Sequence, residues 1–229
     1  MIKILTSIIG IFLFLISISW SMIEIDITEG NREPLPIAIT EFFYDESAKE
    51  LLEDVSSNMR TVMSADLERS GLFKSINKEA FIQANKSMHL KPRFEDWRLI
   101  KAQGLVTGDL SLEGEKLKVE FRLWDTLAEK EIEALVLITT QDNWRRVSHM
   151  IADKIYERLT GEEGYFDTRI VYVSESGPKN ERVKKLAIMD QDSFNHRFLT
   201  SGKELVLTPR FNPVRQEITY LSYFKNLPR

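Results

Sequence analysis

The chain has 229 residues, 31 Lys and Arg against 35 Asp and Glu, and 43% apolar residues. This length and apolar content can fill one large domain or two small ones, and they exclude a disordered chain. The net charge of −4 offers no broad attraction to nucleic acid or anionic lipid, and the lack of Cys excludes thiolate chemistry and a disulfide framework.

The first residues, 1–21, are interpreted as a secretory signal peptide. Lys3 precedes an uncharged run over residues 4–23, and small residues before the bond that follows Ser21 complete the pattern of a cleavage site. The competing interpretation is an uncleaved membrane anchor, because about 20 uncharged residues can span a bilayer. Cleavage is favoured, since the densest apolar stretch is shorter. The mature chain then begins at Met22 and has no direct membrane insertion.

Residues 22–36 are predicted to form an extended leader followed by a flexible hinge. Isoleucines alternate with acidic or polar residues, which places the isoleucines on one side of an extended chain. Breaker residues, among them Gly30 and Pro34, then separate the leader from the next strand. Such a segment can add a strand to the sheet edge of a partner or pair within its own domain, and the pattern alone favours neither. The candidate partner-binding residues are Met22, Ile23, Glu24, Ile25, Asp26, Ile27 and Thr28.

Residues 37–165 are predicted to form an α/β domain, a mixed sheet packed with amphipathic helices. A strand is expected over residues 37–42. After it, Ser47 and Glu50 resemble a capping box, and apolar residues recur at helical spacing until a Ser-Gly pair ends the helix. This stripe of Met and Leu is assigned to a core rather than to a ligand site. Short helices are expected near Asn77 and over residues 94–103.

The second half of this domain is predicted to hold a hairpin, a further strand and a closing helix. Residues 105–112 and 116–124 flank Gly114, and in the second segment apolar residues alternate with charged ones, which indicates a hairpin with one solvated face. A strand is expected over residues 131–140 and an amphipathic helix, ended by glycine, over residues 144–159. Helices between strands favour a compact layered domain.

Residues 166–229 are predicted to form an incomplete β-propeller, about one blade and the start of a second. The segment that starts at residue 169 is echoed from residue 217, an offset of 48 residues that suits the repeat of propeller blades. Two more strands are expected over residues 185–189 and 196–199, with a polar turn between them. A plain antiparallel sheet is the alternative that the repeat alone leaves open.

The sequence resembles the TolB family at several places. The run Gly164–Ser174 (GYFDTRIVYVS) is similar to the junction between the two domains of that family. Residues 186–192 and 207–213 resemble its first blade and the start of the next, and the Ile-rich leader resembles its N-terminal segment. The resemblance extends over nearly all of the mature chain. It implies a periplasmic, non-catalytic protein of the Tol-Pal system.

The resemblance also implies partners. In the family the leader engages the inner-membrane protein TolA after signal cleavage, and the closed propeller binds the lipoprotein Pal. The implied role is an adaptor that supports outer-membrane integrity and constriction during cell division. Two departures stand out: Val214 and Arg215 replace the Asp-Gly of family blades, and the family resembles six-bladed propellers whereas this sequence stops at Arg229. Because blades bury their faces against neighbours, a longer gene product is expected.

No catalytic, cofactor-binding or metal site is predicted. The histidines lack metalloprotease spacing, and neither a phosphate-binding glycine loop nor a dinucleotide fingerprint occurs. His149 and Asp153 lie one helical turn apart, which is interpreted as a surface pair in preference to the edge of a metal site. Residues 190–195 begin like a calcium loop, but Phe194 stands where an oxygen ligand is needed, so a β-turn is favoured.

Two alternative functions stay open beside the adaptor. In a secreted hydrolase the propeller would be the regulatory part, and the catalytic domain would follow Arg229. A membrane-anchored sensor would require that the chain stay uncleaved at Ser21. The coding sequence beyond Arg229 separates the hydrolase from the adaptor, and the mass of the exported protein tests the anchored sensor.

Overall fold

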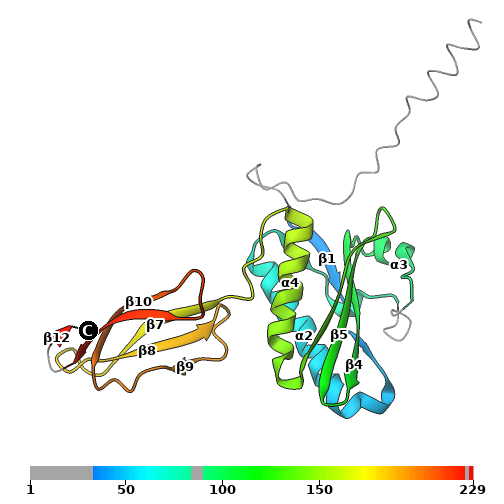
Figure 1. Cartoon of the computed structure of the whole chain (residues 1–229). Helices are drawn as coiled ribbons and strands as arrows, with labels where there is room; N and C mark the ends of the chain where they lie inside the picture. Colours follow the sequence, from blue (N-terminus) through cyan, green and yellow to red (C-terminus); the bar gives the residue numbers. More distant parts are fainter. Residues whose placement is uncertain (1–32, 84–89, 225–226, 229) are drawn as a thin grey trace, which may run out of the picture.

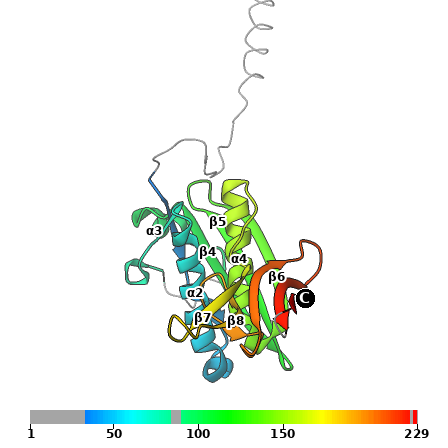
Figure 2. The same ribbon diagram turned by 90° about the vertical axis from the view of Figure 1, so that its left-hand side faces the viewer.

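The computed structural model describes residues 33–83, 90–224 and 227–228 of the chain. Within this part, a mixed sheet with helices is followed by two small antiparallel sheets. Figures 1 and 2 show the long helices α2 (Lys49–Arg69) and α4 (Trp144–Thr160) side by side on one face of the mixed sheet. The two small sheets lie beyond α4, away from the mixed sheet (Figure 1). The α/β layering expected from the sequence is confirmed.

The mixed sheet has the strand order β3-β1-β4-β5-β6, and β2 pairs with β4 outside this path. β1 is parallel to both of its neighbours, whereas β4, β5 and β6 form an antiparallel meander. β1 is therefore an interior strand, and β3 and β6 are the edges. The strands are β1 (Leu35–Ile39), β2 (Phe43–Tyr44), β3 (Phe73–Ser75), β4 (Gly104–Glu113), β5 (Lys116–Asp125) and β6 (Lys130–Thr140).

The main core lies between the two long helices and one face of the sheet. The apolar stripe of α2 is confirmed as core, because Leu52, Met59, Met63 and Leu67 pack with Phe121 of β5. The closing helix α4 is buried on more than one side, since it packs against α2 and is also covered by the segment that follows it. No helix in the described part of the chain combines the length and apolarity that a membrane span requires.

A second, smaller core lies on the opposite face of the sheet, under α3 (Phe94–Leu99). Trp97 is buried there beside Trp124, and its indole N–H donates to the side-chain oxygen of Gln83 at 3.1 Å. The helix expected over residues 94–103 is shorter than predicted. It ends at Leu99 because the left-handed conformation of Lys101 (φ 61) turns the chain toward β4.

The start of α2 differs from the capping box expected at Ser47 and Glu50. The carboxylate of Asp45 accepts the backbone N–H of Ser47 at 3.0 Å and its hydroxyl at 2.8 Å, which caps a short 3-10 helix, η1 (Glu46–Ala48). α2 then begins without a side-chain cap. The prediction was wrong because Asp45 binds the very hydroxyl that the capping box requires.

The first strand also differs from its expected range of residues 37–42. β1 begins at Leu35, whose N–H donates to the carbonyl of Leu72, and it ends at Ile39. Beyond Ile39 the backbone turns toward α2. Arg60 donates to the carbonyl of Ile39 and Ser56 donates to the carbonyl of Phe42, each at 2.8 Å. These helix side chains satisfy carbonyls that a longer strand would have paired within the sheet.

The two small sheets have the orders β7-β8-β9 and β10-β11-β12, and β10 also contacts β7 and β8. The echoed segments lie in β7 and β11, and each of these strands pairs with the strand that follows it. The two echoed strands hold different places, since β7 is an outer strand of its sheet and β11 is the middle strand of the other. The bounds are β7 (Arg169–Ser176), β8 (Val183–Asp190), β9 (Arg197–Phe198), β10 (Leu205–Phe211), β11 (Ile218–Phe224) and β12 (Leu227–Pro228).

Candidate functional site at the domain junction

The predicted signal peptide and the predicted leader up to residue 32 lie outside the described residues, so their roles stay predictions, whereas the last two residues of the predicted hinge belong to β1. This concerns Ser21 and the candidate residues Met22, Ile23, Glu24, Ile25, Asp26, Ile27 and Thr28. The strand into which the leader runs is described. Leu35 is bonded to Leu72, and the N–H of Gln103 donates to the carbonyl of Pro36 at 2.9 Å. The chain after the leader is thus held from its first strand residues onward.

The segment that leaves α4 is packed against that helix. Gly161 ends α4 in the left-handed conformation (φ 76), and its N–H donates to the carbonyl of Glu157 at 2.9 Å. Phe166 is fully buried, and its ring meets that of Tyr156 edge to face at 5.7 Å between centroids. The buried aromatic residue of the Gly164–Ser174 run therefore fixes the segment between α4 and the small sheets against the helix.

Asp153 of α4 holds the backbone of this junction. Its carboxylate oxygens accept the N–H groups of Phe166 at 2.6 Å and Asp167 at 3.0 Å. A Cβ at Gly164 would lie 2.5 Å from the Cα of Asp153, so only glycine fits there. Burial raises the pKa of Asp153, and the two backbone N–H groups oppose that rise. The interpretation of His149 and Asp153 as a surface pair was wrong, because both residues have buried partners.

A cluster of polar and charged residues, here called the junction cluster, joins α2 and α4 to the turn between β8 and β9. The side-chain amide of Gln191 binds α2 twice: it donates to Asp66 at 3.0 Å and accepts from Arg69 at 2.7 Å. The turn is thereby fastened to the α/β domain. The members of the junction cluster are Asp66, Arg69, Arg145, His149, Gln191 and Asp192.

His149 lies at the centre of the junction cluster, with 3% of its side chain exposed. Its Nδ1 lies 2.5 Å from Asp66 Oδ2, and its Nε2 lies 3.6 Å from Asp192 Oδ2. Nε2 is buried and has no hydrogen-bond partner among the described residues. Burial acts to lower the pKa of His149, but the carboxylates of Asp66 and Asp192 outweigh it, so the pKa is raised.

Arg145 contacts two residues of the β8–β9 turn. Its guanidinium pairs with Asp192 and lies 3.5 Å from the centre of the Phe194 ring. Burial acts to raise the pKa of Asp192, but the pairing with Arg145 and the N–H of Phe194 lower it overall. The β-turn favoured for residues 190–195 is confirmed, since the N–H of Ser193 donates to the carbonyl of Asp190 at 2.9 Å.

The junction cluster also approaches the geometry of a metal site. His149, Asp190 and Asp192 place ligand atoms within 4.8 Å of one another. These ligand atoms do not fit a cation well, because the carboxylates have other partners. Asp192 is paired with Arg145, and Asp190 accepts a hydrogen bond from the side-chain amide of Asn195 at 2.5 Å. A divalent cation bound there would have to share the carboxylate of Asp192 with the guanidinium of Arg145, which repels it. The geometry instead favours a network of buried ion pairs and hydrogen bonds.

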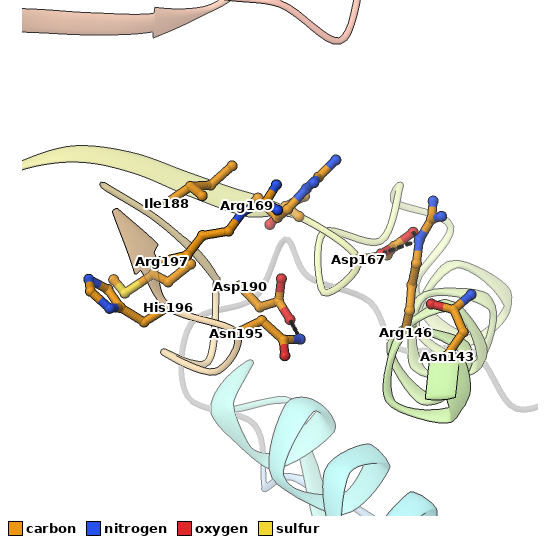
Figure 3. Close-up of a pocket in the computed structure, with 11 residues that line it drawn as sticks. Asn143, Arg146, Asp167, Arg169, Ile188, Asp190, Asn195, His196 and Arg197 are labelled. Atoms are coloured by element: carbon orange, nitrogen blue, oxygen red, sulfur yellow. Dashed lines mark hydrogen bonds and ion pairs between the residues drawn. The ribbon is translucent and has the colours of Figure 1, made fainter. Parts of the chain in front are cut away.

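A pocket of about 620 Å³ opens beside the junction cluster, between the start of α4 and the first small sheet (Figure 3). Arg146 Nε lies 3.1 Å from both carboxylate oxygens of Asp167 on one side, and Arg169 and Arg197 extend from the strands on the other. Thr168 supplies the hydroxyl group among the described residues that line the pocket. This hydroxyl donates to a backbone carbonyl rather than to a base. This pocket lacks the arrangement of a nucleophilic active site.

The sequence does not predict the junction cluster, although it holds a signal for two of its six members. Asp66 interrupts the apolar stripe of α2 between Met63 and Leu67, and a carboxylate on a buried face requires a partner. His149 likewise lies among the buried positions of α4. The partners Gln191 and Asp192 carry no such signal, because they lie in a polar turn whose docking position depends on the tertiary structure.

The layered α/β domain, the sealed junction and the two small sheets packed on each other define a class of protein. It is a two-domain protein in which an α/β domain is docked on the first strands of a β-propeller.

Comparisons with known proteins identify the family within this class. Residues 23–132 match the TolB amino-terminal domain, and residues 156–229 match the TolB beta propeller domain. The chain is 58% identical over 217 residues to the Tol-Pal system protein TolB of Pelagibacter ubique, and 54% identical over 208 residues to that of Paramagnetospirillum magneticum. The crystal structure of TolB from Acinetobacter baumannii is similar with a TM-score of 0.72 at 25% identity. The chain belongs to the TolB family.

The two alignments cover 92% and 90% of this chain but 49% and 46% of the relatives, and the crystal structure is matched over 90% of this chain and 48% of its own. The chain thus spans about half the length of the curated relatives it matches. The resemblance to the TolB family and the fold class, an α/β domain followed by an incomplete propeller, are confirmed.

Proposed function

We propose that the chain works in the periplasm as part of a non-catalytic adaptor of the Tol-Pal system, which links TolA at the inner membrane to Pal at the outer membrane. Cleavage after Ser21 delivers it there. Residues Met22–Thr28 bind TolA, and the complete propeller binds Pal. The linkage supports outer-membrane integrity and constriction during cell division. Membership of the TolB family and the names of the curated relatives support the assignment to this system.

The interior position of β1 is the observation that best supports an intermolecular role for the leader. β1 is already paired on both sides, so the sheet offers no place beside the strand that follows the leader. The near edge, β3, offers three residues, whereas the leader pattern covers residues 22–28. The first residues of the far edge, β6, include Glu131 and Glu133, which repel acidic leader residues, while the later residues of β6 are uncharged. An edge on a partner that is longer than β3 and complementary to the acidic leader residues suits the leader better.

The chemistry of the leader indicates which residues supply the affinity. Each isoleucine buried in a partner's pocket contributes roughly 1.5 to 3 kcal/mol before the cost of ordering the segment. The backbone hydrogen bonds of an added strand provide alignment in addition. We therefore assign the affinity to Ile23, Ile25 and Ile27. Glu24 and Asp26 lie on the opposite side of the strand, which stays in solvent.

A capture experiment tests this assignment. The chain starting at Met22, with Ile25→Lys, is mixed with the immobilised periplasmic part of TolA, and capture is expected to fall at least about tenfold, because a charge replaces an apolar anchor. Thr28→Lys is the matched control: it adds the same charge on the opposite side of the same strand and should keep most of the capture. Neither change should alter the melting temperature. Equal capture of Ile25→Lys and the unsubstituted chain would refute the leader's role.

A further inference from the structure

His149 lies between a carboxylate of its own domain and a carboxylate of the first small sheet. Asp66 belongs to α2, which packs directly against the helix of His149, so this contact is internal to the α/β domain. Asp192 belongs to the β8–β9 turn and reaches Nε2 only because the small sheet is docked. The contact between His149 and Asp192 therefore reports on docking, whereas the contact with Asp66 does not.

The protonation state of the ring decides whether the second contact attracts or repels. Nδ1, at 2.5 Å from Asp66, is assigned as a donor. In a neutral ring Nε2 then turns a lone pair toward the carboxylate of Asp192, in a buried position where no other described group satisfies it. A second proton replaces that repulsion by the attraction of an imidazolium for a carboxylate.

We propose that His149 is a pH-dependent latch between the α/β domain and the first small sheet. Protonation of its ring tightens the interface, and loss of that proton loosens it.

The charges around the ring favour the proton. Arg69 and Arg145 oppose it, but each is engaged with an aspartate of the junction cluster, at 3.3 Å in the pair of Arg69 with Asp66. The carboxylates in and beside the cluster outnumber the two arginines, so the positive charge of an imidazolium reduces the excess of negative charge. The charged groups in and beside the cluster are Asp66 and Arg69 from α2, Arg145 and Asp153 from α4, and Asp190 and Asp192 from the β8–β9 turn.

The direction of the pH effect follows from the contact that docking adds, because the carboxylate of Asp192 faces Nε2 and acts to raise the pKa of His149. A state that raises the pKa of a histidine is stabilised at pH values below the pKa that the ring has in the other state. This contribution is lost as the pH rises through the raised value. Each unit by which docking raises the pKa changes the docking equilibrium about tenfold. Docking is therefore tightest on the acid side.

The latch can be measured in the full chain with a pair of fluorescent labels. Because the sequence has no Cys, Asn58→Cys on α2 and Lys179→Cys in the β7–β8 loop create a unique pair of labelling sites, and both positions are exposed. Single-molecule energy transfer between the labels gives the docked population from about pH 5 to about pH 9. We expect that population to fall as the pH rises through the range in which the ring titrates.

Two substitutions separate the latch from a general effect of pH. His149→Gln keeps a donor for Asp66 but cannot gain a proton, so the docked population should stay near its alkaline level at every pH. His196→Gln is the matched control: it removes an exposed histidine of the same sheet, outside the junction cluster, and should leave the pH profile unchanged. A profile of His149→Gln that equals that of the unsubstituted chain overturns the proposal, as does an unsubstituted chain without pH dependence.

A second measurement covers the case in which His149→Gln does not fold. The ring of His149 is titrated by nuclear magnetic resonance in the unsubstituted chain and in Asp192→Asn. The latch requires that Asp192→Asn lower the pKa of His149. An unchanged pKa of His149 in Asp192→Asn overturns the proposal, because Asp192 is the carboxylate that docking supplies.

Discussion

The α/β domain and the two small sheets bury their apolar residues to different degrees. The α/β domain closes a core between two helices and a sheet. Among the described residues from β7 onward, the buried apolar residues are Leu186, Ala187, Ile188 and Val206, while large apolar side chains such as Ile170, Phe198, Phe211 and Tyr220 are exposed. A layered domain thus completes its core by itself, whereas blade-like sheets depend on what packs against them.

The largest expected effect compares one phenylalanine from each region. Phe121 of β5 is 1% exposed and Phe211 of β10 is 41% exposed. Phe121→Ala should lower the free energy of unfolding by about 3 to 5 kcal/mol, because it leaves a cavity in a closed core. Phe211→Ala should lower it by less than about 1 kcal/mol. Urea denaturation followed by the helical circular dichroism signal measures both, and equal losses would show that the two regions are equally closed.

A smaller effect is expected at the junction that connects the two regions. Gly164→Ala places a Cβ against the backbone of α4 at Asp153, so the junction must shift, at a cost of roughly 1 to 3 kcal/mol. Thermal denaturation measures the loss, and faster cleavage by chymotrypsin at Tyr165 would locate it. Glu163→Ala, at the preceding exposed position, is the matched control and should change neither measurement. An unaffected Gly164→Ala would mean that the junction is loosely packed.

The smallest expected effect is a pH dependence from Asp153. Because burial raises its pKa above the ordinary value, 3.8, the folded chain binds this proton more tightly than the unfolded chain. Its contribution is present below that value and is lost as the pH rises through the raised pKa. Asp192, whose pKa is lowered, contributes in the opposite sense. The difference in unfolding free energy between the unsubstituted chain and Asp153→Asn isolates the contribution, and a difference that does not vary with pH contradicts it.

The regular elements with strong periodicity were the most predictable part of the fold. The hairpin around Gly114 follows from alternating residues and a glycine with φ 64, and both long helices follow from apolar residues at helical spacing. The start of α2 was not predictable in detail, since several polar residues compete for one cap and Asp45 is the one that binds. Local patterns thus define elements better than their ends.

The contacts at the junction could not be predicted from the sequence. The run Gly164–Ser174 was recognised by its resemblance to a family, but the need for a glycine at its first position depends on Asp153 of α4 lying against it. The partners of His149 come from α2 and from the β8–β9 turn, so neither contact follows from residues near it in sequence. A pair at helical spacing, His149 and Asp153, suggested a local interaction that does not form.

The interior position of β1 has a mechanical consequence. The first residues of β1, Leu35–Ile37, pair with β3 on one side, and its last residues, Ile37–Ile39, pair with β4 on the other. The hydrogen bonds run across the strand direction. A tension applied to the chain before Leu35 along the strand axis would load these bonds together, in shear, rather than open them one after another. A tether attached at this end would therefore resist extraction better than one attached to an edge strand that can be peeled away.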